Sequence, residues 1–179
     1  MSRGLARPLT PSPSRSPRED AVAVVAFGAN LGDREGAIRG AAERLARLPL
    51  VSDVRLSSLH ETVAVRLDGP DPDAPGYVNA VALVTTRLAP EILLGMLLAI
   101  EDEFGRERRE RWGDRTLDLD LIAYGDETSH TPTLELPHPR AGERLFVLDP
   151  WLELDPAAHL PGVGAVAPLA AALREGDRG

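Results

Sequence analysis

Four stretches of the chain carry the hydrophobic pattern of β-strands. Residues 21–27 and 77–86 are apolar on both faces for most of their length, which is typical of central strands. Residues 51–60 predict a further strand. In residues 117–121 leucine and aspartate alternate, so a strand there places the leucines on one face and the aspartates on the other.

Two stretches between these strands have the period of amphipathic helices. The first begins after Asp33, a suitable N-cap, and ends at Pro49. The second begins at Pro90 and ends at Gly105, residues that favour helix starts and C-caps respectively. The residues expected to face the core are Ile38, Ala41, Ala42, Leu45 and Leu48 in the first helix and Ile92, Leu93, Met96, Leu97, Ile100 and Phe104 in the second.

The predicted order is strand, helix, strand, strand, helix, strand. Two split βαβ units of this kind predict an α+β fold with a ferredoxin-like βαββαβ core, in which helices cover one face of an antiparallel sheet. Residues 125–179 are expected to add a C-terminal extension of short pieces. Within it, an apolar segment ends at Pro150 and a closing helix spans residues 168–174.

The N-terminal residues 1–20 contain four prolines, four serines and four arginines, and few apolar residues. Such a segment cannot build a core, so we expect a disordered tail followed by one domain at residues 21–174. An arginine- and serine-rich targeting peptide is the alternative. The prolines fit an amphipathic targeting helix poorly.

Composition narrows the classes of function. The net charge of −8 argues against general nucleic-acid binding, and the absence of cysteine excludes disulfides and thiolate chemistry. Every basic residue apart from histidine is arginine, which excludes a Walker-type phosphate loop and a lysine Schiff base. No apolar run is long enough to span a membrane. We expect a cytoplasmic monomer without a membrane or nucleic-acid partner.

Asp118 and Asp120 are the strongest candidates for chemistry. Nothing in strand propensity favours two neighbouring carboxylates, and a divalent cation relieves their repulsion. Mg²⁺ is typically held by one or two carboxylates together with substrate phosphates. Guanidinium groups suit phosphate oxygens, so the pattern indicates polyphosphate chemistry, with a solvated strand end as the alternative. The arginines just upstream are Arg106, Arg108, Arg109, Arg111 and Arg115.

Four other residues carry a functional hypothesis. Tyr77 and Asn79 lie two residues apart on a predicted strand, where a ring beside an amide suits a flat heterocycle; a core tyrosine and a turn asparagine are equally compatible with this spacing. Glu101, at the edge of a helical stripe, reaches the metal or an arginine, or is an ordinary flanking acid. His138 lies in a rigid corner between two prolines, which suits a ligand contact. The loop 61–76 is long enough to be functional or disordered.

One sequence block closely resembles the signature of a known family. Arg111-Trp112-Gly113-x-Arg115-Thr116-Leu117-Asp118-Leu119-Asp120 is similar to the signature of 6-hydroxymethyl-7,8-dihydropterin pyrophosphokinases, enzymes of folate synthesis. The resemblance extends over roughly residues 22–156. The other matching blocks are Gly28-x-Asn30-Leu31-Gly32, Tyr77-x-Asn79-Ala80, Ile100-Glu101 with Gly105-Arg106, Pro137-His138-Pro139 and Arg144-x-Phe146-Val147-Leu148-x-Pro150.

The resemblance implies transfer of the β,γ-diphosphate of ATP to the pterin hydroxymethyl oxygen, leaving AMP. It implies that Asp118 and Asp120 hold two Mg²⁺ ions and that Arg106 and Arg115 neutralise the phosphates; these four would be the catalytic residues. The residues implied to contact ATP are Glu101, Arg106, Arg108, Trp112, Arg115, Leu121, His138 and Arg144. Those implied to contact the pterin are Thr62, Val65, Tyr77, Asn79 and Phe146.

The chain departs from the family pattern at several positions. Val63-Ala64-Val65 follows Thr62 where the family usually has prolines and a glycine. Asp114 replaces a common proline, Ala29 a common serine and Leu98 a polar residue that often meets the nucleotide. None of these changes removes a metal-binding carboxylate or a phosphate-binding arginine, so we expect an active enzyme.

Two competing functions stay open. Another Mg²⁺-dependent nucleotidyl or phosphoryl transferase on the same fold would fit the carboxylates and arginines. An RNA-binding module on a ferredoxin-like sheet would need exposed aromatic residues and a basic surface. The aromatic content of 4% and the negative net charge disfavour the second alternative.

Overall fold

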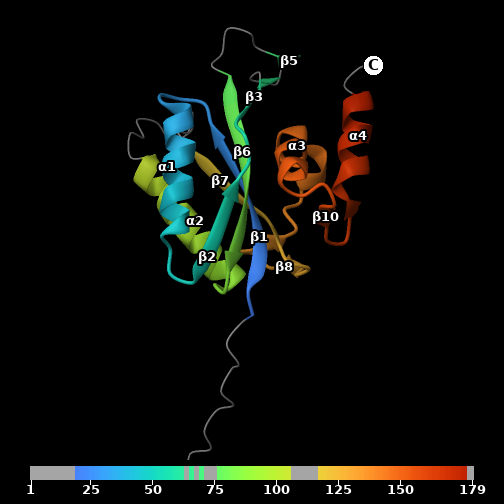
Figure 1. Ribbon diagram of the computed structural model, residues 1–179. Coiled ribbons are helices and arrows are strands. Elements are labelled where there is room, and N and C mark those ends of the chain that lie inside the picture. Colours follow the sequence, from blue (N-terminus) through green and yellow to red (C-terminus); the bar gives the residue numbers. More distant parts are fainter. Residues whose placement is uncertain (1–18, 63–64, 67–68, 71–75, 106–116, 177–179) are drawn as a thin grey trace, which may run out of the picture.

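An antiparallel sheet lies at the centre of the protein (Figure 1). The structure is a computed structural model that describes residues 19–62, 65–66, 69–70, 76–105 and 117–176, with only the backbone at 65–66 and 69–70. The order of the main strands is β2 (Val51–Leu56), β6 (Tyr77–Thr86), β1 (Ala21–Ala29) and β7 (Asp118–Tyr124), and β3 (His60–Thr62) pairs with the start of β6. This order confirms the predicted ferredoxin-like core.

Two helices cover one face of the sheet, as predicted (Figure 1). In α1 (Arg34–Ala46) the carboxylate of the N-cap Asp33 accepts a hydrogen bond from the backbone N–H of Gly36 at 3.0 Å. The second helix, α2 (Pro90–Phe104), begins at its predicted proline and is followed by Gly105 as C-cap. The buried residues shared by these helices and the sheet include Val25, Phe27, Ile38, Leu45, Leu93, Leu97 and Ile100.

Ile92 does not belong to this core, although its spacing predicted burial. Its exposed fraction is 53%, whereas Leu93 and Leu97 are fully buried. Residues Leu93, Leu97 and Ile100 follow the i, i+4, i+7 spacing of one helical face, and Ile92 lies about 100° away from Leu93 around the axis. The apolar stripe of α2 is therefore narrower than the sequence pattern suggested.

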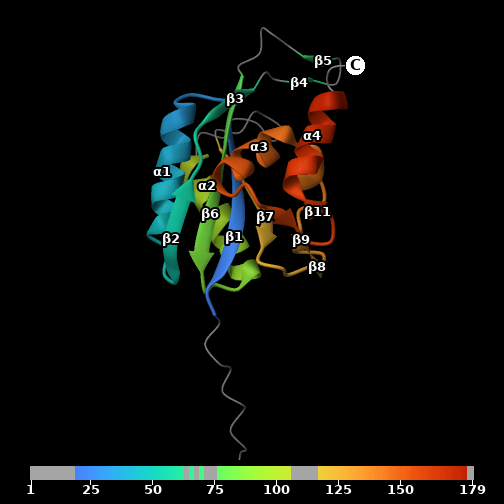
Figure 2. The ribbon, with the colours of Figure 1, turned by 45° about the vertical axis from the view of Figure 1, so that its right-hand side comes forward.

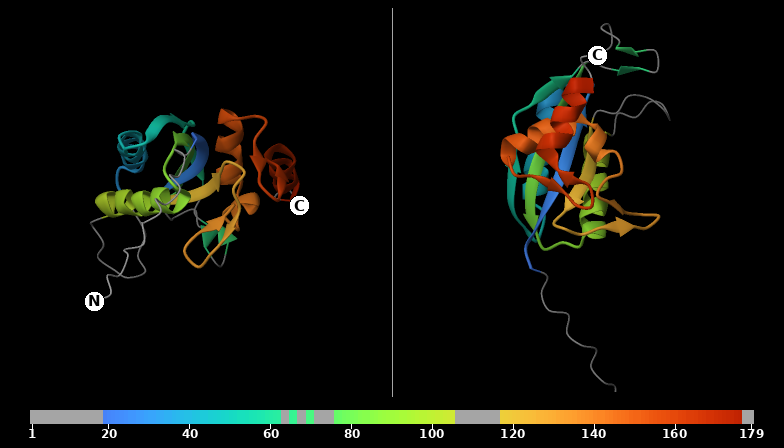
Figure 3. Two further views of the ribbon diagram at one scale, coloured as in Figure 1. Left: turned by 90° about the horizontal axis from the view of Figure 1, so that it is seen from below. Right: turned by 90° about the vertical axis from the view of Figure 1, so that its right-hand side faces the viewer.

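The C-terminal extension forms a second helical layer on the opposite face of the sheet (Figures 1 and 3). Its helices are α3 (Leu145–Leu154) and α4 (Val166–Gly176). The sequence predicted only short pieces after the core, and did not indicate that two of them are helices packed on the face opposite to α1 and α2. Val24 and Val81 from the sheet pack in this second core with Val147, Trp151 and Val166 from the extension. Alternation along β1 and β6 supplies both cores from the same strands.

Pro150 lies inside α3, although the sequence predicted that it ends an apolar segment. A proline there removes the backbone hydrogen bond to the carbonyl of Phe146. Val147, Leu148 and Trp151 are almost fully buried around it. Their burial offsets the lost hydrogen bond, because each large apolar side chain contributes about 1.5–3 kcal/mol when removed from water.

The strand predicted over residues 51–60 is interrupted between β2 and β3. Ser57 still exchanges hydrogen bonds with Val81, whose backbone N–H donates to the Ser57 hydroxyl at 3.0 Å. His60 is the next residue in register, opposite Asn79, so two residues lie against the single residue Ala80. This irregularity is a β-bulge, and it turns β3 away from the line of β2 (Figure 2).

Three short pairs of strands lie outside the main sheet in the described part of the chain. They are β4 (Val65–Arg66) with β5 (Gly69–Pro70), β8 (Ser129–His130) with β9 (Glu135–Leu136), and β10 (His159–Leu160) with β11 (Gly164–Ala165); a 3₁₀ turn spans Ala141–Glu143. Of the predicted N-terminal tail, residues 1–18 lie outside the described residues. Among the described helices, none combines the length and apolar character that a membrane crossing requires.

Candidate active site

A row of residues in register crosses the sheet on the face that carries α3. Asp118 of β7 lies opposite Gly28 of β1, Gly28 lies opposite Asn79 of β6, and Asn79 lies opposite His60 of β3. Directly opposite residues in an antiparallel pair point to the same face. Gly28 presents no side chain in the middle of this row, where a Cβ atom would make an ordinary van der Waals contact with Asn79 Oδ1 at 3.5 Å.

Asp118 and Asp120 share this face, as the alternation predicted. Asp120 lies two residues along β7 from Asp118. It is opposite Ala26, a residue of the second core. The intervening Leu119 is 2% exposed and packs on the opposite face, against α1 and α2. The two carboxylates are only half-buried, so ligands can reach them from the side of α3.

The N-terminal end of α3 places the positive charge of Arg144 beside this pair of carboxylates. Arg144, the N-cap residue of α3, donates from Nη1 to Asp120 Oδ2 at 3.3 Å, and its side chain is 20% exposed. The guanidinium carbon Cζ of Arg144 lies 5.7 Å from the ring centroid of Phe146, a distance typical of a cation–π contact. The ring of Phe146 is 40% exposed, so the predicted aromatic residue stands at the surface beside the arginine.

His138, near the start of the C-terminal extension, lies within electrostatic reach of Asp120. Its backbone N–H donates to the carbonyl of Ile122 in β7 at 2.8 Å, and its Nδ1 accepts a hydrogen bond from the backbone N–H of Arg140 at 3.2 Å. Burial lowers the pKa of His138 below its ordinary value, and the negative charge of Asp120 partly opposes this shift. A neutral ring with Nδ1 as acceptor carries its proton on Nε2.

The predicted pterin residues Thr62, Tyr77 and Asn79 also come together. Thr62 lies opposite Tyr77 in the sheet, and Asn79 donates from Nδ2 to the Thr62 hydroxyl at 2.8 Å. Asn79 is 5% exposed, whereas Tyr77 is half-buried and is therefore not a core tyrosine. This hydrogen bond orients the Asn79 amide, and it joins residues that the sequence separates by the long loop.

Glu101 of α2 contacts the backbone of β7 between the two aspartates. It is 9% exposed, and its Oε1 accepts a hydrogen bond from the backbone N–H of Leu119 at 2.6 Å. Leu119 lies between Asp118 and Asp120, so this contact holds the segment that presents both. The bond also joins the last turn of α2 to the start of β7, and the sequence pattern did not indicate it.

Leu121 is buried on the same side as Glu101. Its side chain is 4% exposed in the core against α1 and α2, on the face opposite to the aspartates. The structure therefore does not place the Leu121 side chain on the face of the aspartates, and its contact with adenine stays a prediction.

Several predicted site residues lie outside the described residues. They are Arg106, Arg108, Trp112 and Arg115, together with the neighbouring Arg109 and Arg111. Val65 belongs to β4, of which the backbone alone is described. The roles of all these residues stay predictions. Leu98, noted as a departure from the family pattern, lies on α2 and is 51% exposed.

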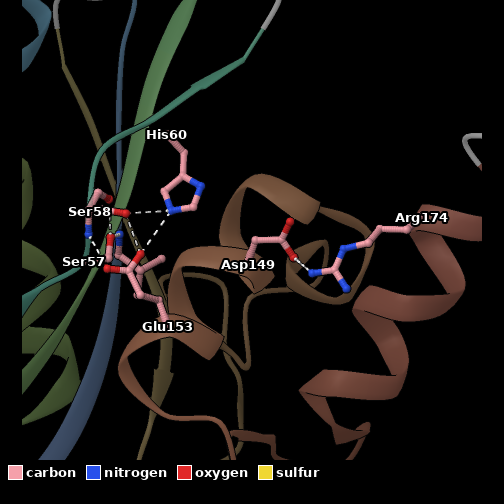
Figure 4. Close-up of polar contacts among 7 residues, drawn as sticks. Ser57, Ser58, His60, Asp149, Glu153 and Arg174 are labelled. Carbon is pink, nitrogen blue, oxygen red and sulfur yellow. Dashed lines mark hydrogen bonds and ion pairs between the residues drawn. The ribbon is translucent and has the colours of Figure 1, made fainter.

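A contact between β3 and α3 was not foreseen. Glu153 accepts hydrogen bonds from the Ser58 hydroxyl at 2.6 Å and the Ser58 backbone N–H at 2.8 Å, and it lies 3.2 Å from His60 Nε2 (Figure 4). The Ser58 hydrogen bonds lower the pKa of the Glu153 carboxyl. The cluster fixes the strand that carries Thr62 against the helix that carries Arg144 at its start. No local pattern reveals it, because its residues are far apart in the sequence.

The donor set at Asp118 and Asp120 fits a hard divalent cation. Within the described part of the chain, no group of three or more histidine, cysteine, aspartate or glutamate residues forms a metal cage. A pair of half-exposed carboxylates suits Mg²⁺, which keeps several waters and takes further oxygens from phosphates. Zn²⁺ would require three or four protein ligands, often histidine or cysteine.

Comparison with known proteins decides the family. Residues 24–156 match the family described as 7,8-dihydro-6-hydroxymethylpterin-pyrophosphokinase (HPPK). This chain belongs to the HPPK family. It is 41% identical over 145 residues to a 2-amino-4-hydroxy-6-hydroxymethyldihydropteridine pyrophosphokinase from Synechocystis, covering 81% of this chain and 72% of that protein. The enzymes of the same name from Bacillus subtilis and Pseudomonas aeruginosa are 40% and 42% identical over 74% and 76% of this chain, and 77% and 82% of their own lengths.

Solved structures support the HPPK fold. The structure described as HPPK-DHPS in complex with substrates aligns with a TM-score of 0.64 at 12% identity, over 89% of this chain and 44% of that one. HPPK-DHPS from Plasmodium falciparum with pterin and p-hydroxybenzoate aligns with a TM-score of 0.60 at 14% identity, over 88% of this chain and 42% of that one. This chain spans less than half the length of these structures, which therefore show the fold alone.

Proposed function

We propose that this HPPK-family chain transfers diphosphate from ATP to the hydroxymethyl group of 6-hydroxymethyl-7,8-dihydropterin, a step in tetrahydrofolate biosynthesis. The hydroxymethyl oxygen forms a bond to the β-phosphorus of ATP while the bond from that phosphorus to the α,β-bridging oxygen breaks. The products are AMP and the pterin diphosphate, and the hydroxyl proton is released. The observation that carries the proposal is the pair Asp118 and Asp120, presented on one face beside Arg144 in a chain of this family.

The aspartates are proposed to hold two Mg²⁺ ions. Such ions, when bound, would polarise the phosphoryl oxygens and orient the attacking and leaving groups. The chain's own contribution is to keep both carboxylates on one face, through the alternation of β7 and the hydrogen bond from Leu119 to Glu101. Arg144, which neutralises Asp120 in the described structure, becomes available to a phosphate when a cation takes its place at the carboxylate.

The nucleotide is proposed to bind at β7 and the start of the extension. His138 and Arg144 flank Asp120 there, and the backbone of Leu121 lies on the same strand. Arg106 and Arg115 are proposed to neutralise the phosphates and the charge that develops in the transition state, where an arginine can be worth roughly 10³–10⁵ in rate. Arg108, Trp112 and Glu101 complete the proposed ATP set.

The pterin is proposed to bind at the adjoining ends of β3 and β6. Asn79 and Thr62 supply the hydrogen-bonding groups, and their mutual contact at 2.8 Å orients them. Tyr77 and Phe146 supply the aromatic surfaces, and Val65 adds a contact from β4. Gly28, without a side chain, separates this place from Asp118 in the same row of the sheet, which suits a substrate that must reach from one to the other.

We further propose that the enzyme acts as a monomer in the cytoplasm. ATP and the other small substrates of folate synthesis are available in that compartment.

Incubation with ATP, Mg²⁺ and 6-hydroxymethyl-7,8-dihydropterin tests the activity. AMP should form in a one-to-one ratio with pterin diphosphate, and chelation of Mg²⁺ should stop both. Release of pyrophosphate with a nucleotidyl product would instead identify the competing transferase. Folded protein that forms no AMP under these conditions would contradict the proposal.

A further inference from the structure

The guanidinium of Arg34 bridges two strands at the edge of the proposed pterin subsite. Its Nη1 donates to the carbonyl oxygen of Gly76 at 2.5 Å, and its Nη2 donates to Glu61 Oε1 at 3.3 Å. Gly76 directly precedes β6, and Glu61 lies in β3. The Nη1 group therefore contacts the residue just before β6, and the Nη2 group contacts β3. These two strands carry the proposed pterin residues Thr62, Tyr77 and Asn79.

These two strands lie close together at the point of contact. Thr62 is opposite Tyr77 in register, and a Cβ atom added to Gly76 would lie only 3.0 Å from the Thr62 carbonyl oxygen. Asn79 donates to the Thr62 hydroxyl one step further along the sheet. A change in the separation of β3 and β6 at this end would therefore move Thr62 and Tyr77 and strain the bond to Asn79.

Arg34 itself is held by α1 and not by the strands it joins. It is the first residue of the helix, next to the N-cap Asp33, and its backbone N–H donates to the carbonyl of Gly32 at 3.0 Å. Its side chain is 30% exposed, whereas that of Glu61 is 74% exposed. The helix therefore offers a fixed support from which the guanidinium reaches both strands.

We propose that Arg34 is a positioning residue for the pterin subsite: it sets the spacing of β3 and β6, and thereby the placement of Thr62, Tyr77 and Asn79. This inference rests on the proposed function. Arg34 acts through Gly76 and Glu61 and contributes nothing to the carboxylate pair, so its effect falls on pterin affinity and leaves phosphoryl transfer unchanged.

The two arms contribute unequally. The contact with the Gly76 carbonyl is a partly buried hydrogen bond from a charged donor, a class that contributes more than neutral hydrogen bonds. The ion pair with Glu61 is exposed and contributes little in water. Most of the effect of Arg34 should therefore be lost when its donor to Gly76 is removed, and little should be lost when Glu61 is neutralised.

Steady-state kinetics on four variants test the inference, with pterin and ATP varied separately. Arg34→Ala should raise the KM for the pterin roughly tenfold, as expected for loss of a hydrogen bond from a charged donor. The KM for ATP and kcat should change less than about twofold. Arg34→Lys should be intermediate, because an ammonium group can still reach the carbonyl but lacks the planar fork. Glu61→Gln should raise the pterin KM less than about twofold.

Arg39→Ala is the matched control. Arg39 lies on the same helix, is 61% exposed and pairs only weakly, at 3.6 Å, with Glu35. Its removal should change neither KM. Thermal unfolding of each variant separates positioning from stability, because a merely structural role would lower the melting temperature without raising the pterin KM selectively. If Arg34→Ala does not fold, Arg34→Gln and Arg34→Lys decide the question by the same kinetic criterion.

Two results would overturn the inference in an active wild-type enzyme. One is an unchanged pterin KM in folded Arg34→Ala protein, and the other is a fall in kcat with the pterin KM unaltered. A wild-type protein that forms no AMP from ATP and pterin would instead refute the proposed function. The two failures are therefore distinguishable in one set of assays.

Discussion

The two faces of the central sheet differ in how their residues are used. On the face covered by α1 and α2, the strand side chains are apolar apart from the buried Thr86 at the end of β6, and Phe27, Leu97 and Leu119 meet in a continuous core. On the face covered by α3 and α4, only half of each strand is apolar. Val24 and Val81 pack there, whereas Gly28, Asn79 and Asp118 occupy the other half.

This difference separates stability from chemistry within a single sheet. The strands are antiparallel, so the end of β1 meets the starts of β6 and β7, and the polar positions of all three gather at one end. The site therefore stands beside a packed core without interrupting it. We expect substitutions on the two faces to have opposite consequences, and the first two of the following three predictions test this.

Replacement of Asp118 or Asp120 by asparagine should have the largest effect on activity. Loss of a metal-binding carboxylate should lower kcat at least about 10³-fold, since bound metal ions contribute several kcal/mol of transition-state stabilisation. Both side chains are half-exposed, so the melting temperature should change little. Rate assays combined with thermal unfolding measure the two effects. A variant that kept wild-type turnover would remove these aspartates from the mechanism.

Replacement of Leu97 by alanine should show the converse. This side chain is fully buried on the face of α1 and α2. Its truncation should lower the free energy of unfolding by about 2–5 kcal/mol through lost burial and the cavity left behind. Urea unfolding gives the stability, and turnover per folded molecule should stay near the wild-type value at low temperature. Loss of turnover equal to that of the aspartate variants would show that the two faces are not separable.

Replacement of Glu153 by glutamine should give the smallest effect, one that depends on pH. Hydrogen bonds from Ser58 lower the pKa of this carboxyl below its ordinary value of 4.5 in the folded state. The ionised carboxylate therefore stabilises the fold at pH values above the ordinary pKa. This contribution disappears as the pH falls through the lower pKa of the folded state.

The side chain of Glu153 is 41% exposed, so the difference between wild type and Glu153→Gln at pH 7 should be below about 1 kcal/mol. Denaturant unfolding at a series of pH values should show the two proteins converging below pH 4.5. A difference that stayed constant or grew in acid would mean that the cluster with Ser58 and His60 does not hold the carboxylate in its charged form.

Much of the candidate site followed from local pattern. The shared face of Asp118 and Asp120, and that of Tyr77 and Asn79, required only the alternation of a strand. The caps at Asp33 and Gly105 required only the preferences of helix ends, and both are confirmed. The Glu101 contact with Leu119 and the Arg34 contact with Gly76 had no such signature, because each joins a side chain to a backbone group in a different element.

The sequence by itself determined the order of the main elements, the ferredoxin-like core and the pairing of two carboxylates on one face, because these depend on periodicities that neighbouring residues share. Only the tertiary structure decided that the C-terminal extension forms a second helical layer, that Ile92 is exposed, that α3 continues through Pro150 and that Leu121 packs away from the aspartates. The physical reason is that burial and hydrogen bonding depend on which distant segments meet, and no local period records that.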